Sequence, residues 1–160
     1  GSLDSTLSYG RLWRVQGRDT MQIAGWLKGY REDHPEVKMP IVDDTGVGGG
    51  VTDRLREQGV AVLAFIAGEK AHNEKRFANA QAEAWGLMAD AFRGGNVALP
   101  DDAALAGELS SRRYKIQSDR RIILESKEVL RAKGGHSPDT ADALAMTFSP
   151  RAQGGFRIWL

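Results

Sequence analysis

Two pairs of aspartates stand where they could hold metal ions. Asp43 and Asp44 end the short apolar run 39–42 and precede the glycine-rich stretch 46–50. Asp139 and Asp142 are three residues apart at the start of an expected helix, so they share one face of it. Two like charges there repel each other, and a bound cation would relieve that repulsion. Because carboxylate ligands favour Mg²⁺ or Mn²⁺, Asp43, Asp139 and Asp142 are candidate ligands for such an ion, with Asp44 as an additional candidate.

Each pair also has a purely structural interpretation. Aspartate is common in turns, so Asp43 could simply shape one and cap the next helix. Ser137 as N-cap, Pro138 at the first helical position and Asp139 in the first turn follow the usual rules for a helix start. Asp142 fits these rules less well, because the residues around it make the helix apolar nearly all round and a buried carboxylate needs a partner. The residues alone leave both interpretations open.

Cationic side chains cluster around an expected hairpin turned at residues 117–119, and Lys127 begins the helix after it. Clustered cations beside an acidic metal pocket suit a phosphodiester substrate, although charge also protects the edge of a sheet from unwanted pairing. A lysine at a helix start is unfavourable to the helix dipole, which favours a role for Lys127 near the active site. The candidate DNA-binding residues are Arg112, Arg113, Lys115, Arg120 and Arg121.

Composition limits the alternatives. The chain has 160 residues, of which 41% are hydrophobic, enough for one domain with a real core. Its net charge of +1 excludes a globally basic coat but not a local basic face. The absence of cysteine removes disulfides, thiolate zinc sites and a cysteine nucleophile. No apolar run approaches the ~20 residues that span a bilayer, and we expect no membrane association.

The glycines at 46–50 raise the alternative of a nucleotide-binding α/β domain. Their spacing does not match the dinucleotide fingerprint, in which G-x-G-x-x-G directly follows the strand. No glycine is followed by Lys and then Ser or Thr, so the chain carries no ATP-hydrolysing phosphate loop. We interpret the stretch as a flexible turn into a helix, and nucleotide binding there remains the weaker option.

Strands alternating with helices predict a mixed sheet covered on both faces. The expected strands are 6–9 and 12–15, paired as a hairpin turned at Gly10, then 39–43, 60–66, 96–99, and the hairpin 112–116 with 120–124. The expected helices are 20–32 capped by Thr20, 51–58 ended by Gly59, 73–92, 100–109, 126–133 and 137–148. Within the helix 73–92, Asn79 and Glu83 could form a polar pair.

Taken together, these residues resemble the nuclease domain of tailed-phage terminase large subunits, over residues 19–148. The motif Ser137 through Leu144 is the most specific of five that occur in the family's order. The other four are Asp19-Thr20-Met21-Gln22, Val42-Asp43 through Gly50-Val51, Phe77 through Glu83, and Glu125-Ser126-Lys127-Glu128.

The resemblance implies a ribonuclease H-like fold, with a mixed central sheet flanked by helices. It implies a DNA endonuclease in which two divalent ions about 4 Å apart drive in-line phosphodiester hydrolysis. Asp43 takes the place of the family's second acidic residue and Asp139 the third, with Asp142 their close neighbour. The implied partners are double-stranded DNA, the ATPase domain of the same parent protein, the portal and the small terminase subunit, in the host cytoplasm during virus assembly.

The sequence departs from the family in two places. Gln81 stands where the family usually has arginine. The family begins with a strand bearing the first catalytic aspartate, whereas here Asp4 is the one early candidate and aligns better with the loop that follows. That first strand is missing or altered, so the alternative is a catalytically incomplete module that binds DNA or a portal. We expect residues 1–2 to be a cloning remnant, 3–149 the nuclease domain and 150–160 a C-terminal tail.

Overall fold

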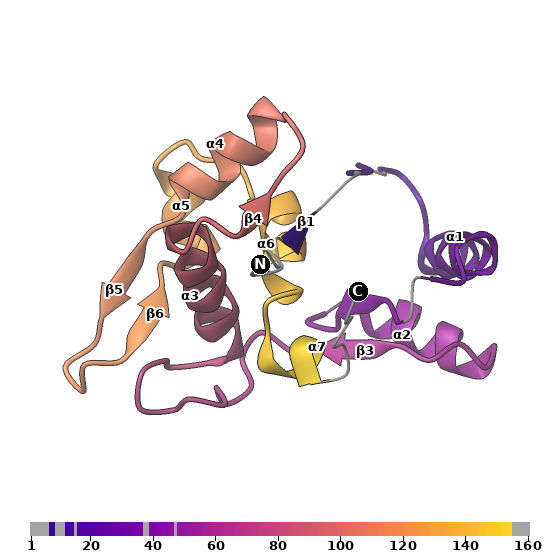
Figure 1. The fold of residues 1–160 in the computed structure, drawn as a ribbon, viewed down its shortest axis with the longest axis horizontal. Coiled ribbons are helices and arrows are strands. Elements are labelled where there is room, and N and C mark those ends of the chain that lie inside the picture. The colour runs from indigo at the N-terminus through magenta and orange to yellow at the C-terminus, as the bar shows by residue number, and fades with distance from the viewer. Residues whose placement is uncertain (1–6, 9–11, 15, 37–38, 47, 155–160) are drawn as a thin grey trace, which may run out of the picture. The chain divides into compact units, whose positions relative to one another are not determined.

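The computed structural model describes residues 7–8, 12–14, 16–36, 39–46 and 48–154 (Figure 1). These residues form two compact units. The smaller lies between positions 15 and 69, and the larger combines the residues before position 15 with those from Lys70 onward. No helix in the described part of the chain has the length and apolar character that crossing a membrane requires.

The smaller unit packs two helices against a pair of parallel strands. Its elements are α1 Thr20–Asp33, β2 Ile41–Asp43, α2 Gly48–Glu57 and β3 Leu63–Phe65. In the strand pair, Val42 stands opposite Ala64. Ala24 from α1 meets Val51 and Leu55 from α2 in the buried core. This core supports β2, whose last residue is the candidate ligand Asp43.

Local signals account for the helix ends in this unit. Asp19, and not Thr20 as predicted, caps α1, because its Oδ1 accepts a 2.8 Å hydrogen bond from the Gln22 amide. The Gln22 side chain accepts one from the Asp19 amide in return, which completes a capping box. Gly59 ends α2 with φ +71°, and the amide of Val60 donates to the Leu55 carbonyl. The predicted glycine C-cap is therefore confirmed.

The elements of the larger unit are β1 Leu7–Ser8, α3 Ala80–Arg93, β4 Val97–Ala98, α4 Ala103–Ser111, β5 Tyr114–Ile116, β6 Ile122–Leu124, α5 Lys127–Ala132, α6 Asp139–Met146 and α7 Pro150–Gly154. In Figure 1 the β5–β6 hairpin lies beside α3, and α6 packs against both α3 and α4. The larger unit is thus built around α3.

The predicted N-terminal hairpin is wrong. Leu7 and Ser8 pair in parallel with Val97 and Ala98, and residues 12–14 belong to no strand. Arg14 explains the difference, because both of its terminal nitrogens lie 2.8 Å from the Asp102 carboxylate. This long-range pairing with the start of α4 takes the segment out of a local hairpin. Residues 6, 9–11 and 15, which the prediction included, lie outside the described residues.

The second predicted hairpin is confirmed. Tyr114 pairs with Leu124 and Ile116 with Ile122 in antiparallel register. The turn is closed by the Arg120 amide, which donates to the carbonyl of Gln117. Arg120 itself has φ +67°, a left-handed conformation that is uncommon for a residue other than glycine.

The helix predicted at 73–92 begins seven residues later, at Ala80. Asn79 caps it by accepting a hydrogen bond from the Ala82 amide. The buried carboxylate of Glu83 accepts 2.7 Å hydrogen bonds from the amides of His72 and Asn73, which holds the preceding segment in turns. The predicted polar pair of Asn79 with Glu83 is therefore wrong, since both side chains bind backbone amides.

The start of α6 also differs from the prediction. Pro138 is the N-cap residue and supplies no side-chain hydrogen bond, while the Ser137 hydroxyl donates to Asp139 Oδ1 at 2.6 Å. Glu108 of α4 supplies the missing acceptor, because its Oε2 lies 2.7 Å from the Ala141 amide. After α6, the expected tail begins as α7, in which Ala152 is buried.

The described residues form a mixed helix-and-strand fold with three two-stranded sheets. Two sheets are parallel and one is antiparallel. The predicted combination of helices and strands is therefore confirmed, while the described strands do not join into one mixed central sheet.

Candidate functional site

Asp142 is a buried carboxylate held by α3. Its side chain lies in the first turn of α6, and the residue is only 9% exposed. Its Oδ1 accepts a 2.8 Å hydrogen bond from Trp85 Nε1, and the side-chain nitrogen Nε2 of Gln81 lies 3.4 Å from the same oxygen. Gln81 and Trp85 are four residues apart and so share one face of α3. Two neutral donors thus fix one oxygen of this acid.

Lys127 faces the other oxygen of Asp142. Its Nζ lies 2.8 Å from Asp142 Oδ2 and 3.7 Å from Asp139 Oδ1. Asp142 Oδ2 is buried and has no hydrogen bond of good geometry, so the contact with Lys127 is an ion pair. The Asp139 side chain is 78% exposed. A lysine at the start of α5 therefore offsets one of the two negative charges of the acid pair at the start of α6.

A second buried acid lies close to this cluster in the sequence. Glu125 pairs with Lys133 at 2.9 Å, and that hydrogen bond lowers the pKa of the Glu125 carboxyl. The Glu125 carbonyl accepts a hydrogen bond from Arg112 Nη1 at 2.8 Å. Burial lowers the pKa of Arg112, and the negative charges of Asp142 and Glu125 oppose that shift. Arg112 is thus an inward-facing cation, with its guanidinium carbon 5.9 Å from the centre of the Trp85 ring.

Asp43 and Asp44 occupy the end of β2 in the smaller unit. Asp43 is exposed, and its Oδ1 accepts a hydrogen bond from the Thr45 amide at 3.0 Å. Thr45 Oγ1 in turn accepts one from the Ala67 amide, which ties this turn to the segment after β3. Asp44 Oδ1 is buried and lacks a hydrogen-bond partner among the described residues. Both acids are carried by a turn at the carboxyl ends of two parallel strands.

Gly48 allows α2 to begin directly against this turn. A Cβ at Gly48 would overlap the carbonyl oxygen of Asp43, so a larger residue cannot stand there without a backbone shift. Gly46, with φ +88°, makes the bend before it. The prediction of a flexible turn over 46–50 is wrong in its second half, because Gly48, Gly49 and Gly50 form the first turn of α2.

The donor atoms of these acids fit a hard divalent cation. Asp43, Asp44, Asp139 and Asp142 offer carboxylate oxygens alone, the ligands that Mg²⁺ and Mn²⁺ favour. The unpartnered Oδ1 of Asp44 is a buried acceptor that a cation would satisfy. No group of three or more His, Asp or Glu gathers at a metal-binding distance within the described ranges. Asp4 lies outside those ranges.

The basic residues of the hairpin differ in their surroundings. Arg113, Lys115 and Arg120 are exposed, whereas Arg112 is partly buried against Trp85. Arg121 is engaged locally, because its Nε lies 2.7 Å from Asp119 Oδ2. The three exposed cations of the hairpin are therefore the ones that a phosphate at the protein surface can reach.

Sequence reasoning missed the α3 residues that hold Asp142. No motif in the sequence marks Trp85, and Gln81 stands out only as a departure from the family. The indole of Trp85 is one signal in the sequence, because a buried indole N–H usually donates a hydrogen bond and therefore needs an acceptor close to its helix. Nothing local points to Asp142 as that acceptor, because it lies 57 residues further along the chain.

Solved structures with a similar fold come from phage terminases. A lysine-to-alanine variant of the nuclease domain of the large terminase subunit gp2 of bacterial virus Sf6, solved with manganese, matches with TM-score 0.73 and 20% identity over 88% of this chain and 78% of that chain. The large terminase nuclease of thermophilic phage G20c with bound cobalt matches with TM-score 0.60 and 21% identity, covering 84% of this chain and 63% of that one.

The unmodified Sf6 nuclease domain matches with TM-score 0.71 and 20% identity over 88% and 77% of the two chains. No protein-family model and no curated protein sequence matches the chain. The resemblance expected from the sequence motifs is thus confirmed as a likeness of fold, since the chain folds like the nuclease domains of phage large terminase subunits.

Proposed function

We propose that this chain is the metal-dependent DNA endonuclease domain of a viral genome-packaging terminase, with a ribonuclease H-like central sheet. The observation that carries the proposal is the buried Asp142, fixed by Trp85 and Gln81 inside a fold like that of terminase nucleases. The second oxygen of Asp142 is buried and, among the described residues, contacts only the Lys127 ammonium group. Removing such an ion pair from water costs free energy, and the pair gives the fold little stability in return. That cost is explained if the oxygen serves a cation in the working enzyme.

Asp43, Asp139 and Asp142 are the proposed metal ligands, with Asp44 and Asp4 as additional candidates. Solved neighbours with manganese, cobalt and magnesium support a divalent ion, and the oxygen donors favour Mg²⁺ or Mn²⁺. In two-metal hydrolysis the ions activate a water and stabilise the leaving oxygen. In this chain Trp85 and Gln81 would orient Asp142, and Lys127 would balance the acid pair while no ion is bound.

The substrate in this proposal is double-stranded DNA. Arg113, Lys115 and Arg120 are exposed on the β5–β6 hairpin and would contact phosphates, while Arg112 and Arg121 would act through their neighbours. The nuclease domain would span residues 3–149, continued by α7. Its proposed partners are the ATPase domain of the parent protein, the portal and the small terminase subunit, in the host cytoplasm.

Replacing Asp43 with Asn tests the assignment. The change keeps the size of the side chain and its hydrogen bond to the Thr45 amide, so folding should be unaffected. Plasmid nicking in Mn²⁺ should disappear. Asp53→Asn is the matched control, because Asp53 is an acid of the same unit whose side chain is 78% exposed. Undiminished nicking by Asp43→Asn would contradict the assignment.

The alternative function is a catalytically incomplete module that binds DNA or a portal. It is favoured by the start of the sequence, where Asp4 is the one candidate for the first catalytic aspartate of the family. A titration with Mn²⁺ separates the two functions. A chain that binds no Mn²⁺ at millimolar concentration and nicks no plasmid, yet retains duplex DNA, would be the binding module.

A further inference from the structure

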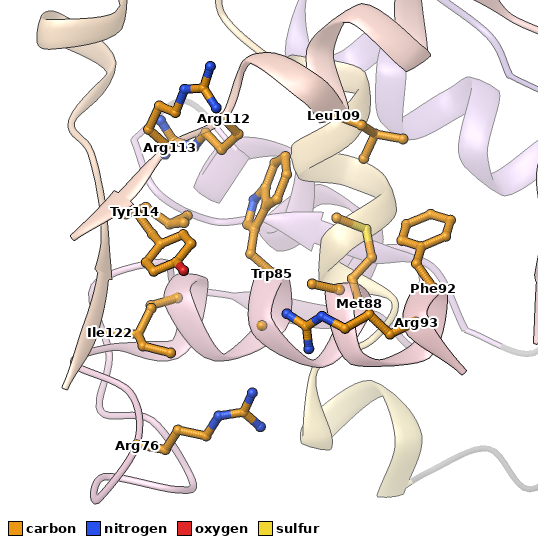
Figure 2. Close-up of a pocket in the computed structure, with 14 residues that line it drawn as sticks. Arg76, Trp85, Met88, Phe92, Arg93, Leu109, Arg112, Arg113, Tyr114 and Ile122 are labelled. Atoms are coloured by element: carbon orange, nitrogen blue, oxygen red, sulfur yellow. The ribbon is translucent and has the colours of Figure 1, made fainter. Parts of the chain in front are cut away.

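A cavity of about 290 Å³ lies within the larger unit, between α3 and the β5–β6 hairpin (Figure 2). Its volume is at the lower end of the range for small-molecule pockets, enough for one planar group. Trp85 stands up from α3 into the middle of it, and Tyr114 faces it from the hairpin. The other large apolar side chains that line it are Met88, Phe92, Leu109, Ile122 and Leu124.

The lining of this cavity is strongly cationic. It includes Arg76, Arg93, Arg112 and Arg113 but no aspartate or glutamate. Arg76 and Arg93 share the single carboxylate of Asp90, which leaves an excess positive charge on that side. On the other side, Arg112 Nε is buried and lacks a hydrogen-bond partner among the described residues. The cavity therefore suits a ligand that combines an apolar body with negative charge.

The hairpin extends the apolar lining to the surface. Tyr114 and Ile116 are 63% and 67% exposed, although they share a face of the hairpin with the half-buried Leu124 and Ile122. Large side chains on the inner face of a hairpin are usually covered. An aromatic ring at the mouth of a cationic cavity offers a stacking surface that any nucleobase could use.

We propose that this cavity binds an unpaired nucleotide of DNA, with the base among Trp85, Tyr114 and Ile122 and the phosphate against the arginines. Single-stranded DNA is recognised in this way, by aromatic side chains that stack on bases and cations that follow the backbone. A paired base cannot enter, because its faces are covered by its neighbours in the duplex. The choice of DNA as ligand rests on the proposed nuclease function.

The cavity also adjoins the candidate metal ligand Asp142. Trp85 lines the cavity with its ring and holds Asp142 with its indole N–H. A base stacked on the exposed ring of Tyr114 would thus lie beside the residue that orients this carboxylate. The site would select an end or a frayed strand and present it beside the acid pair.

The test compares a duplex bearing a short 3′ single-stranded extension with the blunt duplex of the same sequence. Binding is measured by anisotropy in EDTA, so that no metal-dependent cleavage occurs, and a 2-aminopurine in the extension reports stacking. The 160-residue chain should bind the extended duplex about tenfold more tightly than the blunt one, and the 2-aminopurine emission should be quenched. Equal binding of the two duplexes, or an unquenched probe, would overturn the proposal.

Two substitutions locate the effect. Tyr114→Ala and Arg113→Gln should each remove most of the preference for the extension, and neither should affect folding, since both side chains are exposed. The matched controls are Met21→Ala, an exposed large apolar side chain of the smaller unit, and Arg131→Gln, an exposed arginine on α5. Loss of the preference in the controls as well, or in no variant, would contradict the site.

The design separates this proposal from the nuclease function. A chain that nicks plasmid in Mn²⁺ but does not prefer the extension would keep its nuclease function and lose this site. A chain that prefers the extension in EDTA but never nicks DNA would keep the site and lose the proposed activity. Preference for an acidic aromatic peptide over the extension would identify a protein partner and overturn the nucleotide proposal.

Discussion

The indole Nε1–H of Trp85 donates a 2.8 Å hydrogen bond to Asp142 Oδ1, joining α3 to α6 across 57 residues of sequence. Burial restricts both side chains to this conformation, since Trp85 is 8% exposed and Asp142 is 9% exposed. The bond gives a buried polar group on each helix its partner. It thereby fixes the direction in which the acid presents its second oxygen.

Trp85→Phe should weaken both folding and metal binding. Phenylalanine keeps an aromatic ring but leaves Asp142 Oδ1 with only the long contact from Gln81. Loss of one partner of a buried polar group costs about 1–3 kcal/mol of unfolding free energy. We expect that loss in urea unfolding, and a weaker Mn²⁺ affinity by calorimetry. Trp26→Phe, in α1 of the other unit, is the control and should leave Mn²⁺ affinity unchanged.

Glu83→Gln should loosen the segment before α3. The carboxylate is 3% exposed and accepts hydrogen bonds from two amides, and an amide side chain can offer its oxygen to only one of them. The other N–H then meets an NH₂ group, which should cost about 1–3 kcal/mol. Hydrogen exchange at His72 and Asn73 should accelerate. Glu74→Gln, whose side chain is 56% exposed, should change neither quantity.

Gly48→Ala should disturb the turn that carries Asp43. The added methyl group would overlap the Asp43 carbonyl oxygen, and the backbone must move to accommodate it. Overpacking of this kind costs about 1–3 kcal/mol. Gly49→Ala, one residue further along, places its methyl group 3.7 Å from Asp44 Oδ1, an ordinary contact. Thermal unfolding should therefore separate the two variants, and equal midpoints would show that α2 does not begin against this turn.

The ion pair of Arg14 with Asp102 should contribute stability that acid removes. The hydrogen bonds from Arg14 and from the Leu105 amide lower the pKa of Asp102 to about 2, against about 3.9 in an unfolded chain. Because the folded value is the lower one, this stability is present above about pH 4 and is lost as the pH falls through 2. Other carboxylates with lowered pKa values titrate in the same range, so the comparison must be made between variants.

Asp102→Asn isolates this contribution. The difference in urea midpoint between the original chain and the variant should be largest at neutral pH and should shrink as the pH approaches 2. Asp101→Asn replaces the adjacent exposed acid and should show no such pH-dependent difference. A difference that stays constant between pH 6 and pH 2 would mean that the Asp102 charge contributes nothing.

Features determined by neighbouring residues could be predicted from the sequence. The 112–124 hairpin and the glycine that ends α2 depend on local turn chemistry, and both are confirmed. The prediction of the first hairpin was wrong because Arg14 pairs with Asp102, which lies 88 positions away in the sequence. The helix at 73–92 was extended too far because periodicity cannot show that the Glu83 side chain holds the segment before it.

The candidate site also contains features that neighbouring residues determine and features that depend on distant ones. The Asp43 turn and the Asp139–Asp142 pair could be found from motif and spacing, and their role as metal ligands stays a prediction. The partners of Asp142 could not be found, because Trp85 and Gln81 reach it through the packing of α3 on α6. Lys127 was singled out for an unfavourable position at a helix start, and its nearest acid is Asp142.

The N-terminus of α6 depends on another helix for its capping acceptor. Glu108 of α4 accepts the Ala141 amide, so the first turn that carries Asp139 and Asp142 lacks this partner until α4 has docked. An eight-residue helix is too short to persist alone in water. Cation affinity at these acids would therefore report on completed tertiary folding. Under the proposed nuclease function, a nascent or partly unfolded chain would be unable to cut DNA before its packing was finished.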